Sequence, residues 1–170
     1  MRAGAGKRRA RRPVATVDLS IRGRVGLSAL ARARLRLFVQ RMVTAAALRD
    51  GLLEPELGLL LCDDAQIHEL NRAFRNKDRP TDVLAFAQRE GPAAELHPNL
   101  LGDIVISVAT AKRQARGPGG IGGELRLLAA HGLCHLLGYD HRTDREEALM
   151  NRRVAGLLAE GRRRGPVGPA

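Results

Sequence analysis

The sequence predicts a layered α/β domain in which a small four-stranded mixed sheet packs with about five helices. Short apolar segments of strand length alternate with longer segments whose apolar residues recur at helical spacing. The chain has 170 residues without an internal repeat, which is enough for one domain with a full core. A cluster of histidines near the end of a central helix adds a predicted metal site to this fold.

Four segments have the pattern of strands: residues 14–21, 56–62, 83–87 and 101–108. In the first, Val17, Leu19 and Ile21 fall on one face, and Gly102-Asp103 interrupts the last. Residues 88–99 contain two prolines and a glycine and are predicted to form a loop.

Helices are predicted over residues 28–48, 65–74, 109–116, from 124 through the histidines, and 144–160. The first has an apolar stripe of Leu35, Phe38, Met42 and Ala46. Asp63 or Asp64 caps the second helix, which is expected to bury Ile67, Leu70 and Phe74. Residues 117–123 include five glycines but no G-K-[ST] ending, so we expect a mobile connector rather than a phosphate-binding loop.

Basic residues are concentrated at the two ends of the chain. Lys plus Arg number 29 against 18 for Asp plus Glu, a net charge of +11. We expect a disordered basic tail over 1–13, one domain over 14–160 and a second disordered basic tail over 161–170. Such tails can neutralise nucleic-acid phosphates, but a solvated extension without a partner fits the composition equally well.

No segment approaches the roughly 20 apolar residues that a membrane-spanning helix needs. The basic N-terminus lacks the apolar region of a secretory signal, and Cys62 and Cys134 form no disulfide framework. The expected location is therefore the cytoplasm, with no membrane partner.

Three of the five histidines lie between residues 131 and 141. His131 and His135 are one helical turn apart and would present their rings on one face. Gly138 can end the helix in a left-handed conformation and return His141 toward the other two. Three neutral imidazoles with an open fourth position suit a catalytic Zn²⁺, which lowers the pKa of its bound water to about 7. The alternative is three unrelated histidines, one in the core and two in a turn.

The histidine spacing also matches the extended zincin pattern of metallopeptidases, in which Glu follows the first His and serves as base. Here Gly132 occupies that position and supplies no base. Asp140 could substitute, although a carboxylate beside a ligand more often orients it. Cys134 could be a fourth ligand, but a small buried residue is the simpler expectation.

A second cluster contains Arg72, Arg75, Lys77 and Arg79, between a helix end and a strand start. Guanidinium groups bind phosphate in two-pronged fashion and stabilise charge that develops on a phosphodiester. A solvated turn is the alternative. Together with a metal site in the same small domain, the cluster favours a phosphodiester substrate.

Three blocks in this order resemble the YbeY family of bacterial metal-dependent endoribonucleases: residues 70–86 (LNRAFRNKDRPTDVLAF), 101–107 (LGDIVIS) and 131–141 (HGLCHLLGYDH). The resemblance covers about residues 14–160. It implies a single-strand-specific endoribonuclease that matures the 3′ end of small-subunit ribosomal RNA and acts in ribosome quality control. Its partners would be single-stranded RNA, ribosomal RNA and the small ribosomal subunit.

The resemblance also assigns His131, His135 and His141 as zinc ligands and Arg75 as the functionally important arginine facing the metal. Ala85, Ala87 and Cys134 depart from the family's usual Ser, Pro and Leu, and none is a proposed ligand. Two alternatives remain open: a zinc metallopeptidase, and a non-enzymatic ribosome-associated factor with a structural metal. The pattern leaves the oligomeric state open.

Overall fold

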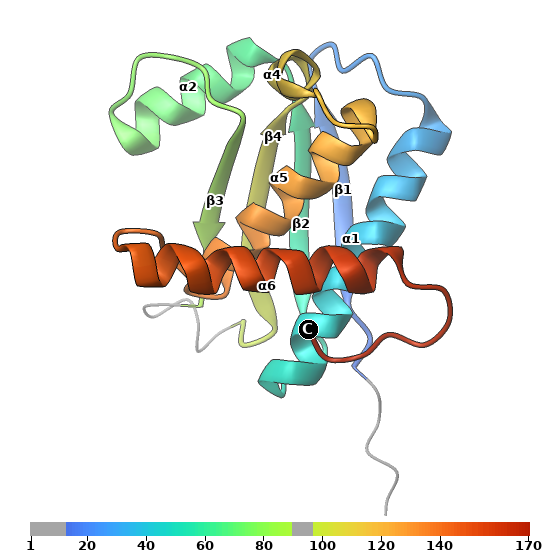
Figure 1. Ribbon diagram of the computed structural model, residues 1–170. Coiled ribbons are helices and arrows are strands. Elements are labelled where there is room, and N and C mark those ends of the chain that lie inside the picture. The colour runs from blue at the N-terminus through green and yellow to red at the C-terminus, as the bar shows by residue number, and fades with distance from the viewer. Residues whose placement is uncertain (1–12, 90–96) are drawn as a thin grey trace, which may run out of the picture.

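A four-stranded sheet in the order β1-β2-β4-β3 forms the centre of the molecule (Figure 1). The computed structural model describes residues 13–89 and 97–170. Strands β1 (Thr16–Arg22), β2 (Glu56–Cys62) and β4 (Leu100–Ser107) are parallel, and β3 (Val83–Ala87) pairs antiparallel with β4 at one edge. The predicted mixed sheet and α/β class are confirmed.

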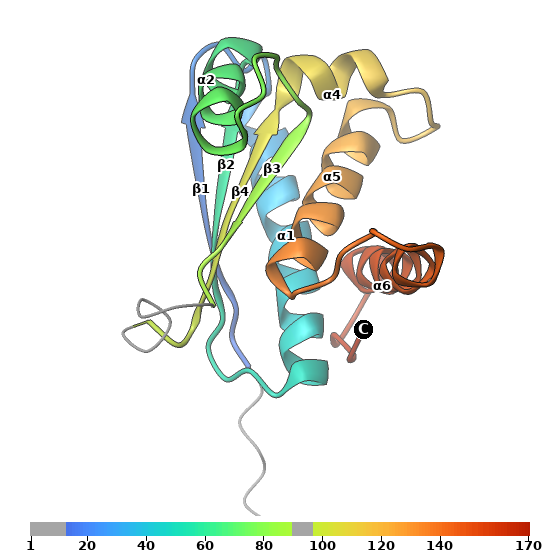
Figure 2. The ribbon, with the colours of Figure 1, turned by 90° about the vertical axis from the view of Figure 1, so that its left-hand side faces the viewer.

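Five helices surround this sheet in the described part of the chain. Figure 2 shows α1 (Ala29–Asp50) and α5 (Gly120–Leu136) on one face, with α6 (Asp144–Arg162) crossing outside them. Helix α2 (Asp64–Arg75) covers part of the opposite face, and the short α4 (Val108–Gln114) follows β4. Helix α5 packs against β3, β4, α1 and α6, so the predicted histidine helix is central to the fold.

Alternation along the strands divides the apolar residues between two cores. Ile104 and Ile106 of β4 join the main core with α1 and α5, whereas Val105 joins a smaller cluster with Ile67 under α2. This is the expected consequence of side chains that point to opposite faces at successive positions. The α1 stripe is buried as predicted, and Ser28 accepts a hydrogen bond from the Ala31 amide at the helix N-terminus.

The interruption predicted at Gly102 is a β-bulge, because the pairing of β2 with β4 shifts register there. Gly102 has φ of +132°, and a Cβ at this residue would lie 2.1 Å from the Phe86 carbonyl oxygen. Asp103 accepts a hydrogen bond from the Gln88 side chain at 3.0 Å and also lies against Gly58. Its role is therefore in the local strand geometry.

The glycine-rich segment differs from the prediction. Helix α5 begins at Gly120, so four residues assigned to the connector are helical. The Gly123 amide donates to the Gly119 carbonyl at 2.9 Å, and Ile121 packs against the main core. The packing of Ile121 against the main core offsets the conformational cost of placing glycines in a helix. Local sequence propensity does not include this contribution, so it predicted a loop.

Phe74 was expected to be buried, and this prediction is wrong: its exposed fraction is 64%. The C-terminal end of α2 extends past the edge strand β3 (Figure 1), so the last helical turn meets the sheet only at its edge. Phe74 instead packs edge-to-face on Phe86, with ring centroids 5.2 Å apart.

The C-terminal segment, expected to be a disordered tail from residue 161, has defined contacts in the structure. Helix α6 continues to Arg162. Beyond it, the Gly168 amide donates to Glu160, Arg41 donates to the Gly165 carbonyl, and the Ala170 amide donates to the Ala45 carbonyl. This segment thus lies against α1 and α6.

Apart from Pro13, the tail predicted over 1–13 lies outside the described residues, as do residues 90–96 of the predicted loop. The division into one domain and two tails stays a prediction. Within the described ranges, no helix combines the length and apolarity needed to cross a bilayer.

Candidate metal centre and basic cleft

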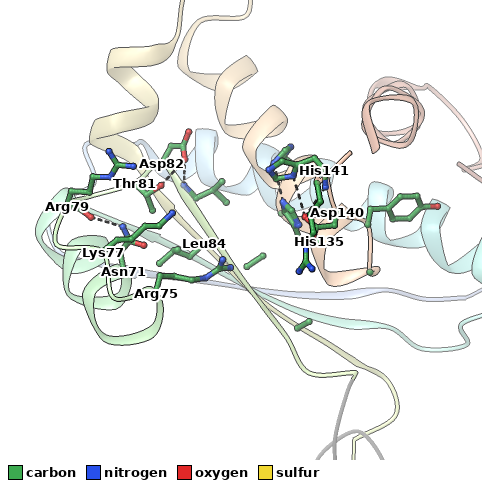
Figure 3. A pocket seen from close by; sticks show the side chains of 18 residues that line it. Asn71, Arg75, Lys77, Arg79, Thr81, Asp82, Leu84, His135, Asp140 and His141 are labelled. Atoms are coloured by element: carbon green, nitrogen blue, oxygen red, sulfur yellow. Dashed lines mark hydrogen bonds and ion pairs between the residues drawn. The ribbon is translucent and has the colours of Figure 1, made fainter. Parts of the chain in front are cut away.

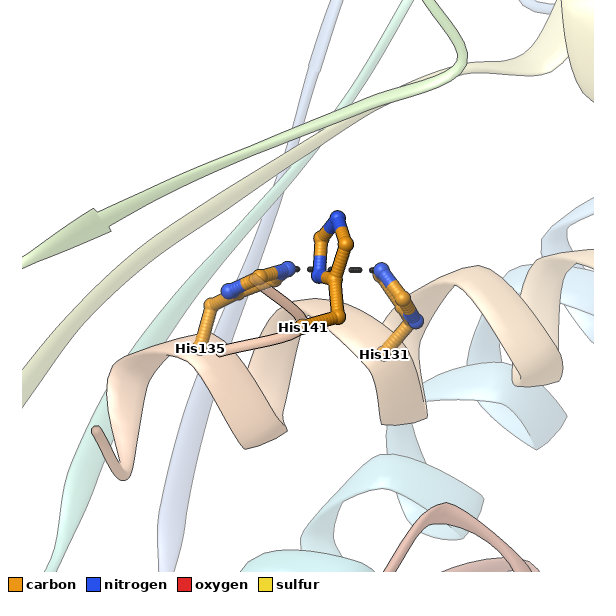
Figure 4. A group of neighbouring side chains, drawn as sticks. All are labelled: His131, His135 and His141. Atoms are coloured by element: carbon orange, nitrogen blue, oxygen red, sulfur yellow. Dashed lines mark hydrogen bonds between the residues drawn. The ribbon is translucent and has the colours of Figure 1, made fainter. Parts of the chain in front are cut away.

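The last two turns of α5 carry the first two histidines of the cluster. His131 and His135 are four residues apart, and their Nε2 atoms lie 3.3 Å from each other (Figure 4). Buried leucines and alanines on the rest of the helix fix its orientation against the sheet, so both rings face away from the core. Helix spacing alone accounts for this pair.

A reversal at Gly138 brings in the third ring. Gly138 has φ of +87°, and the amide of Tyr139 donates to the Cys134 carbonyl at 3.0 Å. These features end the helix in the left-handed conformation that glycine permits. The His141 ring centroid then lies 5.3 Å from that of His135 and 5.8 Å from that of His131. One potential ligand atom from each ring lies within 4.8 Å of the other two.

The donor set fits a tetrahedral divalent ion. Two nitrogens bonded to one zinc at about 2.05 Å are about 3.3 Å apart in tetrahedral geometry, which equals the separation of the His131 and His135 Nε2 atoms. Three imidazole nitrogens are typical ligands of zinc and also suit other first-row metals. The cluster could therefore hold a metal ion.

The local electrostatics keep the two helical histidines neutral. Burial lowers the pKa of His131 below its ordinary value, and the nearby His141 lowers it further, while Asp82 acts in the opposite direction. Burial and the neighbouring histidines likewise lower the pKa of His135. Both rings therefore have a lone pair available for a metal at neutral pH.

Asp140 is held by its own loop. One carboxylate oxygen accepts from the His141 amide at 2.9 Å, and the other lies 2.6 Å from Arg142 Nε. The hydrogen bond from the His141 amide lowers the pKa of Asp140. Its Oδ1 is 3.8 Å from His141 Nδ1, a placement that favours an orienting role over that of a free base.

Cys134 and Gly132 face inward. Cys134 is fully buried, and burial raises the pKa of its thiol to about 12, so it is a packing residue as expected. A Cβ on Gly132 would lie 2.9 Å from Ile104 Cγ2 of β4. The sequence showed that position 132 lacks the zincin glutamate, and the structure adds that close helix–sheet packing leaves little room for one.

The histidines open onto a cleft of about 880 Å³ beside edge strand β3. Arg75, Lys77 and Arg79 line the side formed by the α2–β3 turn, and Figure 3 shows them facing His135 and His141 across the cleft. The structure thus places the predicted Arg75 and the three predicted ligands around one cavity. Arg72 is exposed and does not line it.

Asn71 organises the basic turn, and the sequence analysis missed it. Its buried side-chain amide donates to the Arg79 carbonyl at 2.7 Å, and its backbone carbonyl accepts from the Lys77 amide at 3.2 Å. Asn76, with φ of 53°, ends α2 in the left-handed conformation. The available signal was a polar residue four positions after Ile67, on the face of α2 that packs on the sheet.

Asp82 and Arg142 are two further cleft residues that the sequence analysis did not single out. Asp82 accepts hydrogen bonds from the Val83 amide at 2.8 Å and from Thr81 Oγ1 at 3.3 Å, which fixes the start of β3. Its charge acts on His131 across the cleft. No sequence signal links residue 82 to residue 131, since only the packing of α5 against β3 brings them close.

A three-histidine cluster that shares a cleft with a row of cations defines a candidate hydrolase for a phosphate-bearing substrate. Comparison with known proteins narrows this class. The family described as Endoribonuclease YbeY matches residues 26–161. The chain belongs to the YbeY endoribonuclease family, whose members act on RNA.

Two relatives named Endoribonuclease YbeY illustrate the match. The protein of Moorella thermoacetica is 48% identical over 129 residues, which cover 71% of this chain and 83% of the relative. That of Anaeromyxobacter dehalogenans is 44% identical over 151 residues, covering 82% and 76%. The solution structure of TM1509 from Thermotoga maritima shares the fold, with a TM-score of 0.56 at 23% identity, covering 87% of this chain and 89% of that one.

Proposed function

We propose that this chain is a metal-dependent, single-strand-specific endoribonuclease that acts in 3′-end maturation of small-subunit ribosomal RNA and in ribosome quality control. The observation that carries the proposal is the shared cleft, with three convergent histidines on one side and three cations on the other. The family relationship supports RNA as the substrate. The ribosomal role follows the resemblance, with the small subunit as partner and the cytoplasm as location.

His131, His135 and His141 are the proposed ligands of one Zn²⁺. A bound divalent ion of this kind supplies Lewis acidity, which polarises a phosphoryl oxygen or lowers the pKa of water to about 7. The depressed pKa values of His131 and His135 keep both rings unprotonated and ready to ligate at neutral pH. The hydrogen bond from the His141 amide to Asp140 holds the third ring's loop in place.

Arg75 is the proposed catalytic residue. Its guanidinium lines the cleft and can form two parallel hydrogen bonds to a phosphate, which offset the charge that builds on the phosphodiester during cleavage. Lys77 and Arg79 follow along the same side and can bind adjacent phosphates. The Asn71 side chain holds the turn that presents them.

Base stacking is limited to very few side chains, since the sequence has one Tyr, three Phe and no Trp. Of these, Phe38 is buried and Tyr139 packs against the core, whereas Phe74 is largely exposed beside Arg75. Affinity therefore depends mainly on phosphate contacts, with weak sequence preference and strong salt dependence.

The decisive experiment measures single-stranded RNA cleavage together with metal content. Wild type should cleave, lose activity on chelation and recover it with added Zn²⁺. Arg75→Ala and His135→Ala should be severely impaired, whereas Arg152→Ala, which removes an exposed arginine outside the cleft, should match wild type. Equal rates for wild type, Arg75→Ala and His135→Ala would defeat the assignment. The 3′ termini of the products distinguish attack by water from attack by the ribose 2′-hydroxyl.

Two alternatives predict different results. A metallopeptidase would hydrolyse casein in a His131-dependent manner, but Gly132 provides no base and is packed against Ile104. A ribosome-associated factor with a structural metal would lose its circular dichroism spectrum on chelation. The core of the described residues forms on α1, α5 and the sheet without the histidines, so we expect chelation to preserve secondary structure.

A further inference from the structure

Arg153 of α6 is a buried cation behind the metal centre. Its side chain is 1% exposed, and among the described residues it is the only charged side chain in the buried class. Removing a guanidinium from water costs several kcal/mol unless partners compensate for the lost hydration. The identity of those partners therefore indicates what the residue does.

One partner is Asp50, at the C-terminal end of α1. Arg153 Nη2 lies 2.7 Å from Asp50 Oδ2, which ties α6 to α1. This contact uses only part of the guanidinium, because Nε and Nη1 are buried and have no hydrogen-bond partner among the described residues. If holding two helices together were the whole role, a buried apolar pair would serve as well without orphaned donors.

The second partner is the ring of Tyr139. The Arg153 guanidinium carbon lies 5.8 Å from the ring centroid, within the range of a cation–π interaction. The face of the Tyr139 ring can thus offset part of the desolvation cost of the unpaired Arg153 N–H groups. Arg153 therefore lies against the segment that follows α5.

Tyr139 lies in the segment that joins the end of α5 to His141. It lies one residue after the reversal at Gly138 and two residues before His141. The side chain of His141 is 53% exposed, and His141 belongs to no helix or strand, so regular secondary structure does not fix the position of its ring. The Tyr139 ring, by contrast, packs against the main core. Its position determines where the following residues lie.

We propose that Arg153 is a positioning residue for the metal centre: held by Asp50, it fixes the Tyr139 ring and thereby keeps His141 convergent with His131 and His135. The proposal rests on the metal site described under the proposed function. Groups behind metal ligands typically alter metal affinity by about 10- to 100-fold when removed, and we expect a loss in this range.

Zinc affinity of the intact chain, measured by competition with a chromophoric chelator, tests this role apart from activity. Arg153→Met and Tyr139→Leu should each weaken zinc binding by about 10- to 100-fold. Tyr139→Phe should bind as wild type, because the ring is retained and no hydrogen bond of the hydroxyl is present in the described structure. Arg152→Met removes the neighbouring exposed arginine and serves as the matched control.

Thermal unfolding of the zinc-free proteins separates positioning from simple stabilisation. If Arg153→Met lowers the melting temperature but folded protein binds zinc as tightly as wild type, the positioning role is wrong. Equal losses of affinity in Tyr139→Phe and Tyr139→Leu would also overturn it. Should Arg153→Met fail to fold, Tyr139→Leu decides by itself, since it leaves the Arg153–Asp50 ion pair intact. A wild type that binds no zinc would instead refute the proposed function.

Discussion

Removal of Lys77 should change the salt dependence of RNA binding by a calculable amount. Arg75, Lys77 and Arg79 line the cleft, whereas the fourth cation, Arg142, is already paired with Asp140 at 2.6 Å. Three phosphate contacts on a single strand predict that log affinity falls with log salt concentration at a slope of about −2 from the cleft. Each lost contact should reduce that slope by about 0.7.

The expected result for Lys77→Ala is therefore weaker binding with a shallower salt dependence. Between about 50 and about 200 mM salt, its affinity deficit relative to the parent should shrink by about 2.5-fold. The loss should be similar for different RNA sequences, because a phosphate contact reads no base. Basic residues at the chain ends add to the absolute slope but cancel in the difference between variants.

Fluorescence anisotropy with a labelled single-stranded oligonucleotide measures these slopes. All proteins carry His135→Ala so that the RNA stays intact, and Arg152→Ala provides a control with the same loss of charge outside the cleft. Parallel slopes for the Lys77→Ala and parent proteins would refute a phosphate contact at Lys77. A reduction of the same size in Arg152→Ala would show that net charge, not the cleft, governs binding.

Further predictions concern acidity, packing and the exposed aromatic. The pKa values of His131 and His135 are lowered in the folded protein, so below about pH 6.5 the unfolded chain binds more protons than the folded one. The metal-free protein should therefore lose stability as the pH falls below about 6.5. Denaturant titrations at several pH values measure this, and a stability that rises on acidification would contradict it. Gly132→Ala should destabilise the fold by about 1–3 kcal/mol, because the new Cβ lies 2.9 Å from Ile104 of β4. Gly122→Ala in the same helix places its Cβ in open space, with no packing partner within 4 Å, so this variant should be neutral or stabilising. Equal melting temperatures for the two variants would contradict the packing argument. The ring of Phe74 is 64% exposed and can stack on a base, so Phe74→Ala should weaken binding of single-stranded RNA by about 1 kcal/mol or more. Anisotropy measures the affinity, and circular dichroism checks that the fold is kept. Unchanged affinity would show that no base stacks on Phe74.

Much of the fold follows from local patterns. The predicted bounds of β2 and β3 agree with the structure, and α1, α2 and α6 begin within a residue of their predicted starts. Each of these elements has an apolar repeat at its own period and a capping residue or turn at its ends, so local and tertiary preferences agree. Helix α5 is the exception, because its first turn depends on burial of Ile121 and not on local propensity.

The sequence alone determined which chemical groups could act together within one segment. Helical spacing of His131 and His135 and the glycine before His141 are enough to bring three imidazoles together, because residues four apart share a helix face and glycine allows the left-handed turn.

Only the tertiary structure decided which distant groups share the cleft. Arg75 and Asp82 reach the histidines because α5 packs beside β3, and Arg153 reaches Tyr139 because α6 crosses behind α5. Contacts between segments depend on the packing of whole faces, which no local period encodes. For the same reason Phe74, which is apolar and correctly spaced for the core, is largely exposed, because the end of α2 meets only the edge strand of the sheet.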